Sequence, residues 1–263
     1  MTVLLIPLLG LALARAATPV EVTLHAADGT TLLADWWTDG TSGRRAIVIA
    51  PGYIAHKDRP AFRSLSNDLA ADADVLCLSL RGHGKSSGVW RFGQVEELDV
   101  EAGLREARRA HARVGLLAFS LGAAAALQAA ACGEARPDAL VLVSVPGTLE
   151  EIWQRPGVIL HLLDGRLSRG TMFDVREAFP LWLHADFRPA AEELRVPVLF
   201  VQGTADRLVP ERLARRVYEL VRGPKRFLAV PGGKHAEQLY LDDPAGFLRP
   251  VRAWLSAPAP SLP

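Results

Sequence analysis

The stretch that decides the fold is Val114-Gly-Leu-Leu-Ala-Phe-Ser-Leu-Gly-Ala-Ala-Ala-Ala126, near the middle of the chain. An apolar run with strand character leads into Ser120, and a small residue and an alanine-rich helical run follow. This pattern predicts a strand, a sharp turn and a helix that together lift a serine oxygen out of the backbone. A serine hydroxyl is a poor nucleophile alone, so a catalytic role would require a base, an orienting acid and oxyanion donors elsewhere in the chain.

Two further apolar runs end in side chains of the required kinds. Val196–Gln202 leads into a turn that carries Asp206, and Phe227–Val230 leads into a glycine-rich loop that carries His235. In an open parallel sheet, the carboxyl ends of the strands lie along one edge, where ligands bind. We therefore expect these two residues and Ser120 to converge, although they are remote in sequence.

The composition is that of a globular chain with no bias toward a polyanionic partner. Of its 263 residues, 49% are hydrophobic and 22% charged, and the net charge is +1. A nucleic-acid-binding surface would need a basic stripe, whereas the arginines here alternate with acidic residues. Cys77 and Cys132 lack metal-ligand spacing, and we expect both to be small buried side chains. We therefore expect no nucleic-acid partner and no cysteine metal site.

Residues 1–17 form a separate apolar segment, in which the run from Val3 to Ala14 carries no charge. As a helix this run would be roughly 18 Å long, shorter than the bilayer core of about 30 Å. A signal peptide with Ala14-Arg-Ala16 near the cleavage site, a membrane anchor and a helix docked on the protein all stay open. We favour export or membrane association over a cytoplasmic location.

The rest of the chain alternates between strand and helix patterns, with residues 18–256 predicted as one domain and residues 257–263 as a tail. Val20–Thr38 has the pattern of an antiparallel hairpin. Short apolar runs predict further strands at Ala46–Ala50, Asp74–Leu80, Gly115–Phe119, Ala139–Val145, Val198–Gln202 and Arg226–Val230. Helices are predicted between them at Pro60–Ala71, Gln94–Ala110, Val209–Val221 and Pro244–Leu255. This order indicates an α/β fold with a mostly parallel central sheet and helices on both faces.

Residues 148–188 interrupt this alternation. The segment is long for a connection between two strands of one sheet, and its apolar side chains are scattered among turn residues. It predicts a short helical cap over the site. Met172, Phe173 and Trp182 of the cap are candidates to line a substrate pocket, where they would favour an apolar acyl or alcohol group; the alternative is that the apolar cap residues form the cap's own core.

Several motifs, taken in order, resemble those of the α/β-hydrolase superfamily. They are Pro51-Gly-Tyr53, Arg81-Gly-His-Gly-Lys-Ser86, Ala118-Phe-Ser-Leu-Gly122, Gly203-Thr-Ala-Asp206 and Gly232-Gly-Lys-His235. The similarity covers nearly the whole chain after about Val20 and is greatest to bacterial esterase- and serine-aminopeptidase-like members. The chain departs from the family at Ala118, where the elbow usually has glycine, and at Pro51, where histidine is usual.

The resemblance implies a single α/β-hydrolase domain that acts on a small-molecule acyl substrate and needs no cofactor. Ser120 would be the nucleophile, His235 the general base and Asp206 the acid that orients the base. The backbone N–H groups of Tyr53 and Leu121 would form the oxyanion hole. His83, in a loop near the strand ends, is a further candidate to line the site.

Cleavage of an ester-type bond through an acyl-enzyme is the activity that we expect. Thioester, amide or peptide cleavage and acyl transfer to another acceptor would use the same residues and stay open. Ser120 also fits an ordinary helix N-cap, and Asp206 fits a turn aspartate. A non-catalytic binding protein with this fold is the alternative from another class.

Overall fold

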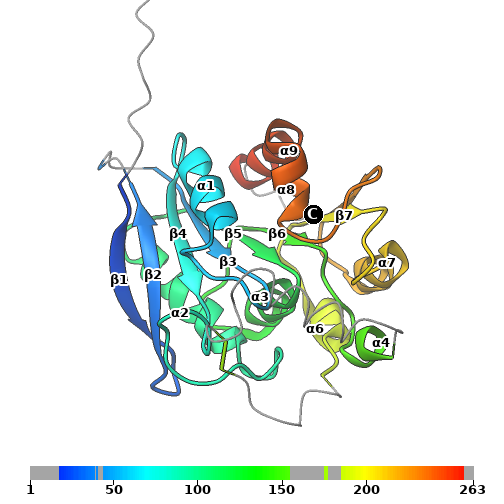
Figure 1. The fold of residues 1–263 in the computed structure, drawn as a ribbon, viewed down its shortest axis with the longest axis horizontal. Coiled ribbons are helices and arrows are strands. Elements are labelled where there is room, and N and C mark those ends of the chain that lie inside the picture. Colours follow the sequence, from blue (N-terminus) through cyan, green and yellow to red (C-terminus); the bar gives the residue numbers. More distant parts are fainter. Residues whose placement is uncertain (1–17, 39, 41–43, 155–174, 177–184, 258–263) are drawn as a thin grey trace, which may run out of the picture.

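The computed structural model describes residues 18–38, 40, 44–154, 175–176 and 185–257 (Figure 1). Within them the chain forms an eight-stranded sheet in the order β1-β2-β4-β3-β5-β6-β7-β8. Strand β2 pairs antiparallel with β1 and β4, and the remaining neighbours are parallel. The strands are β1 (Val20–His25), β2 (Thr31–Trp37), β3 (Ala46–Ala50), β4 (Asp74–Ser79), β5 (Val114–Phe119), β6 (Ala139–Val143), β7 (Val198–Gly203) and β8 (Lys225–Val230).

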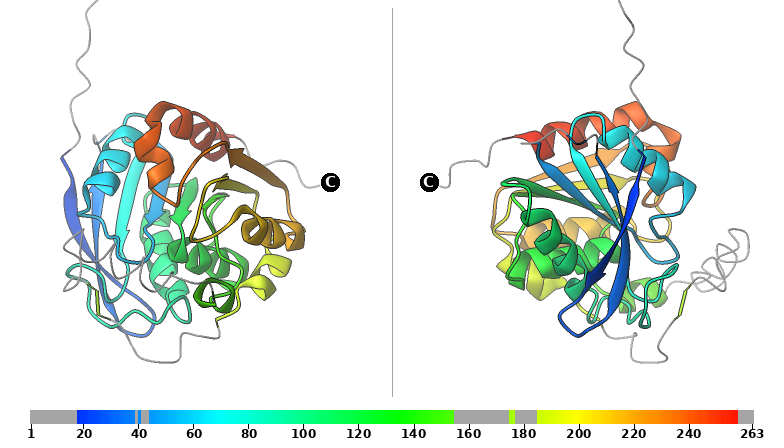
Figure 2. Two further views of the ribbon diagram at one scale, coloured as in Figure 1. Left: turned by 45° about the vertical axis from the view of Figure 1, so that its right-hand side comes forward. Right: turned by 90° about the vertical axis from the view of Figure 1, so that its left-hand side faces the viewer.

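Helices cover both faces of this sheet (Figure 2). One face carries α1 (Pro60–Leu69), α8 (Gln238–Asp242) and α9 (Pro244–Ser256), which pack on one another and on β4 and β6. The other face carries α2 (Glu97–Arg108), α3 (Leu121–Cys132), α6 (Arg188–Glu193) and α7 (Glu211–Leu220), with the short α4 (Glu150–Trp153) beside them. Each face has its own hydrophobic core, which we call the α3-side core and the α9-side core.

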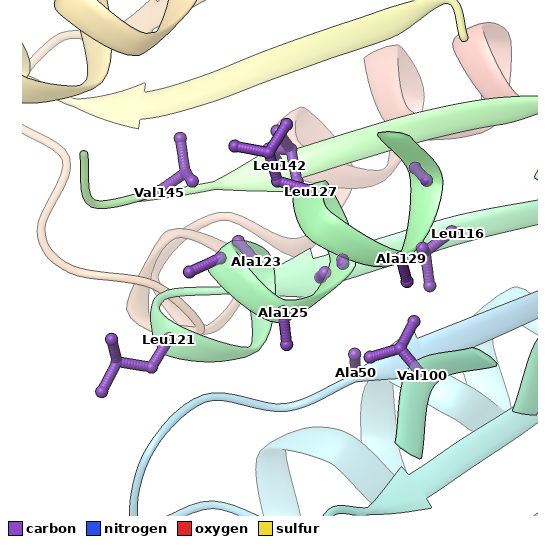
Figure 3. Close-up of a cluster of buried hydrophobic side chains, with 14 of the residues drawn as sticks. Ala50, Val100, Leu116, Leu121, Ala123, Ala125, Leu127, Ala129, Leu142 and Val145 are labelled. Atoms are coloured by element: carbon purple, nitrogen blue, oxygen red, sulfur yellow. The ribbon is translucent and has the colours of Figure 1, made fainter. Parts of the chain in front are cut away.

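The central strands are continuous apolar runs because both of their faces are covered. All residues of β3, β4, β5, β6 and β7 are buried, whereas the edge strand β8 is mostly half-buried. Helix α3 is made mainly of alanine and leucine and is buried on nearly all sides. Figure 3 shows Ala123, Ala125 and Ala129 of this helix among side chains of the α3-side core. Its small side chains let the helix lie close to the sheet.

The predicted α/β architecture is confirmed, and the predicted strands and longer helices lie within a few residues of the observed ones. Cys132 is a correction: its side chain is exposed, because it is the last residue of α3, where the chain leaves the core. Much of the predicted cap, the N-terminal segment 1–17 and residues 258–263 of the predicted tail lie outside the described residues. Among the described residues, no helix has both the length and the apolar character needed to cross a bilayer.

Candidate active site

Ser120 occupies a sharp turn between β5 and α3. Its backbone angles are φ 52° and ψ −122°, which are unusual for a residue with a side chain and cost about 1–3 kcal/mol. The turn is held by hydrogen bonds from the Ser120 N–H to the Val143 carbonyl at 2.8 Å and from the Ala123 N–H to the Ser120 carbonyl at 2.9 Å. Gly122 lets the helix start there, because a Cβ at this position would lie 2.0 Å from the Pro51 carbonyl oxygen.

The structure brings together the three side chains that the sequence placed at separate strand ends. His235 Nε2 lies 2.9 Å from Ser120 Oγ, and His235 Nδ1 lies 2.8 Å from Asp206 Oδ2. Because a carboxylate only accepts hydrogen bonds, this contact requires the proton on Nδ1 and leaves Nε2 as an acceptor toward the serine hydroxyl. His235 is 22% exposed and the Asp206 side chain 0% exposed, so the contacts run from the cavity surface into the interior.

Asp206 is buried, yet it has enough hydrogen-bond donors to stay ionised. Its Oδ1 accepts hydrogen bonds from the N–H groups of Leu208 and Val209, both at 2.9 Å, and its Oδ2 accepts one from Gln202 Nε2 at 3.2 Å. Burial raises the pKa of Asp206, but His235 and the hydrogen bonds outweigh this effect and hold the pKa below its usual value. The carboxylate therefore carries its charge beside the imidazole.

Ser144 belongs to the same constellation and was missed by the sequence reasoning. It is fully buried, has a left-handed φ of 53°, and follows β6 just as Ser120 follows β5. Its hydroxyl accepts a hydrogen bond from the Ala236 N–H at 3.0 Å and is also hydrogen-bonded to Asp206. The sequence pattern placed this serine inside a strand predicted to end at Val145, whereas the observed strand ends at Val143, so Ser144 is the first residue after it, at the edge where the other site residues gather.

The loop that carries His235 crosses closely over the end of β7. A Cβ on Gly203 would lie 2.3 Å from the Gly233 carbonyl oxygen and 2.4 Å from that of Lys234. Only a glycine in β7 allows this approach, and the approach holds the histidine over the strand ends. Glycine at this position is therefore part of the site, although it has no side chain to contribute.

The two candidate oxyanion donors come from two different segments of the chain. Tyr53 is on the loop after β3. Leu121 is the first residue of α3 and is labelled in Figure 3. Amides in the first turn of a helix have no acceptor within the helix, so the Leu121 N–H is suited to an incoming oxygen. Both residues line the cavity that contains Ser120 and His235.

His83 lies behind this loop. Its side chain is fully buried; Nε2 accepts a hydrogen bond from the Ile54 N–H at 3.1 Å, and Nδ1–H donates one to the Arg81 carbonyl at 3.0 Å. Ile54 has a left-handed φ of 62°, which is strained for a β-branched residue. The expectation that His83 lines the site is corrected, because the glycine-rich turn folds beneath the loop and uses the imidazole to hold it.

A cavity of about 480 Å³ opens over Ser120 and His235. The described residues that line it come from the loops after β3, β5, β6, β7 and β8. The site therefore lies at the carboxyl edge of the sheet, as the strand pattern predicts. The other candidate lining residues, Met172, Phe173 and Trp182, lie outside the described residues.

The chain matches a family model described as "Alpha/beta hydrolase family" over residues 47–250. It belongs to this family. This alpha/beta hydrolase is 28% identical over 238 residues to an uncharacterized protein of Mycobacterium tuberculosis, covering 84% of this chain and 74% of the relative.

Solved structures share the fold of this alpha/beta hydrolase. A Pyrococcus furiosus esterase superposes with a TM-score of 0.73 at 18% identity, covering 91% of both chains. Esterase RhEst1 of a Rhodococcus species gives a TM-score of 0.70 at 20% identity, covering 90% of this chain and 98% of its own. An alpha/beta hydrolase of a Penicillium species gives 0.76 at 15% identity, covering 90% and 98%.

Proposed function

We propose that the protein is a serine hydrolase that cleaves an ester-type acyl bond, with Ser120, His235 and Asp206 as its catalytic residues. The observation that carries the proposal is the continuous hydrogen-bonded chain from Ser120 Oγ through both imidazole nitrogens to a buried carboxylate. A surface serine or a helix N-cap needs no such partners. The opening of this chain into a cavity gives a substrate access to the serine.

In the first half of the reaction, Ser120 Oγ attacks the acyl carbon while its proton passes to His235 Nε2. The carbonyl oxygen gains negative charge, which the N–H groups of Leu121 and Tyr53 stabilise. The bond to the alcohol oxygen then breaks, and that oxygen takes the proton from Nε2. The products are the free alcohol and an acyl group attached to Ser120.

In the second half, water takes the place of the alcohol. His235 Nε2 accepts a proton from the water as its oxygen attacks the acyl carbon. The bond between that carbon and Ser120 Oγ breaks, and Oγ recovers the proton. The acid leaves and the starting state returns. Throughout the cycle, Asp206 fixes the orientation of the His235 ring and keeps the proton on its Nδ1. The negative charge of Asp206 stabilises the imidazolium that forms twice in the cycle.

The similarity of the fold to solved esterases supports a hydrolase, and the type of bond that is cleaved is the part of the proposal that a substrate panel must test. Thioesters and amides pass through the same tetrahedral intermediate, so they belong in the first substrate panel. An acyl acceptor other than water would give the same acyl-enzyme. Adding alcohols or amines to the assay distinguishes this outcome, since a transferase forms new esters or amides.

The test treats the purified protein and its Ser120→Ala variant with a fluorophosphonate probe and assays both on p-nitrophenyl esters. We expect labelling and turnover in the wild type only. Ser256→Ala is the matched control, because this serine is an exposed residue at the end of α9. Absence of both labelling and turnover in the folded wild type would reject the proposal and leave the fold as a binding domain.

A further inference from the structure

One wall of the cavity is apolar. Apart from alanine and glycine, its apolar lining side chains all belong to the α3-side core or pack against it. Leu149, Ile152 and Trp153 form the part of this wall that lies on and next to α4. Tyr53 and Leu121 continue it toward Ser120.

A second wall comes from the His235 loop and is polar. It presents Lys234, Glu237 and Gln238, and its charges are of both signs. The apolar neighbours of this loop, Ala236 and Leu239, are part of the α9-side core. The part of the lining on and next to α4 is therefore apolar and the part from the His235 loop is polar, while Arg207, on the loop after β7, adds a further charged side chain.

The two walls also lie over different faces of the sheet. Helix α4 is joined to α7 by an ion pair of 2.5 Å between Glu151 and Arg216. Gly147, which precedes α4, lies next to Val217 of α7. Helix α8, which follows the His235 loop, packs against α1 and α9 instead. Figure 1 shows α4 near α6 and α7, and α8 beside α9.

The position of the proton donor indicates which part of the substrate lies against each wall. The leaving oxygen takes its proton from His235 Nε2, so it must come within hydrogen-bond distance of that atom. The group attached to this oxygen then extends along the histidine loop. The acyl carbon is bonded to Ser120 Oγ, and its chain has the apolar wall left to occupy.

We propose that the substrate is an ester of an apolar acid with a polar, hydrogen-bonding alcohol. Its acyl chain packs against Leu149, Ile152 and Trp153, and its alcohol contacts Lys234, Glu237 and Gln238. This inference rests on the proposed function and adds the class and direction of the substrate. Burying one methylene contributes about 0.8 kcal/mol, or roughly a fourfold gain in kcat/KM for each carbon added on the acyl side.

Two isomeric esters test the direction. Ethyl hexanoate and hexyl acetate contain the same atoms, but the longer chain lies on the acyl side of the first and the alcohol side of the second. We expect kcat/KM to be at least tenfold higher for ethyl hexanoate. Equal or reversed values in a protein that hydrolyses either ester would overturn the inference.

Paired variants and a second pair of esters test which wall contacts the acyl chain and which contacts the alcohol. Ile152→Ser should reduce the isomer ratio severalfold, whereas Gln238→Ala should leave it unchanged. Glyceryl hexanoate should be cleaved several times faster than propyl hexanoate, which has the same three-carbon alcohol skeleton without its hydroxyls, and Gln238→Ala should reduce this second ratio. Isomer ratios unaffected by Ile152→Ser in a folded protein, or faster cleavage of propyl hexanoate, would contradict the assignment.

The failure of this inference is distinct from failure of the proposed function. A protein that neither reacts with the fluorophosphonate nor cleaves any ester lacks the proposed activity altogether. A protein that reacts with the probe but shows no preference for ethyl hexanoate, or cleaves neither isomer, retains an activated serine and contradicts only the substrate class argued here.

Discussion

The amide of Ala236 donates a hydrogen bond to the hydroxyl of Ser144 at 3.0 Å, and both residues have left-handed φ angles, of 52° and 53°. Ala236 directly follows His235, and the same serine hydroxyl contacts Asp206. The Ser144 side chain therefore ties the loop of the base to the carboxylate that orients it. It acts as a positioning residue, since it lies behind the reacting atoms.

Replacing Ser144 by alanine should lower kcat by about tenfold with little change in KM. The change removes one donor from Asp206 and leaves the buried Ala236 N–H without its acceptor, and a buried unpaired group costs about 1–3 kcal/mol. Steady-state kinetics on a p-nitrophenyl ester measure the effect. Ser144→Cys, which retains a weak donor, should recover part of the rate. A rise in KM at constant kcat would show that the residue acts on substrate binding instead.

The strained backbone at Ser120 predicts an unusual order of stability between two inactive variants. Ser120→Gly should be more stable than Ser120→Ala by about 1 kcal/mol, because glycine adopts this conformation without a steric penalty. Urea unfolding of both variants measures the difference. At Ala253, an exposed position within α9, the change to glycine should instead cost about 1 kcal/mol. Equal stability of the two Ser120 variants would mean that the turn carries no strain.

The buried His83 should affect catalysis, because it holds the loop that carries the candidate oxyanion donor Tyr53. His83→Gln can place an amide oxygen near the position of Nε2 and keep the bond to Ile54, whereas His83→Asn reaches only the Arg81 carbonyl. We expect kcat to fall severalfold more in the asparagine variant. His25→Ala, at an exposed strand position, is the control and should be unchanged. The opposite order of the two His83 variants would assign the role to the Arg81 contact.

Glu96 predicts a pH dependence of stability. Its buried carboxylate accepts hydrogen bonds from the N–H groups of Arg91 at 2.5 Å and Gly93 at 2.6 Å, and burial raises its pKa from 4.5 to about 7. Between these two values the folded state holds a proton that the unfolded state has lost, so stability falls as pH rises from 4.5 to about 7.

The loss attributed to Glu96 is about 3 kcal/mol, at roughly 1.4 kcal/mol for each unit of pKa. Glu96→Gln does not titrate, so the stability difference between wild type and variant should change by an amount of this order between pH 4.5 and pH 8. Urea unfolding at both pH values measures it. A stability difference independent of pH would show that the carboxylate has the same proton affinity in the folded and unfolded states.

The sequence predicted most of this architecture because the central strands are buried on both faces and stand out as apolar runs. Ser120, Asp206 and His235 were found for a related reason, since each follows such a run. Short helix α8 was not predicted, because Gln238–Asp242 is too brief to show a helical period. The roles of Ser144 and His83 could be assigned only from the three-dimensional structure. The role of Ser144 depends on its contact with the His235 loop, and the role of His83 depends on how its glycine-rich turn packs against the loop of Tyr53.

Each wall of the cavity rests on a different hydrophobic core, so a substitution in one wall should leave the packing behind the other wall unchanged. A substitution on α4 alters packing among α3, α6 and α7, whereas one in the loop of His235 alters packing among α1, α8 and α9. Effects at distant positions without shared partners add. Acid preference and alcohol preference can therefore diverge separately among descendants of this chain, and a library built on one face can be combined with a library built on the other.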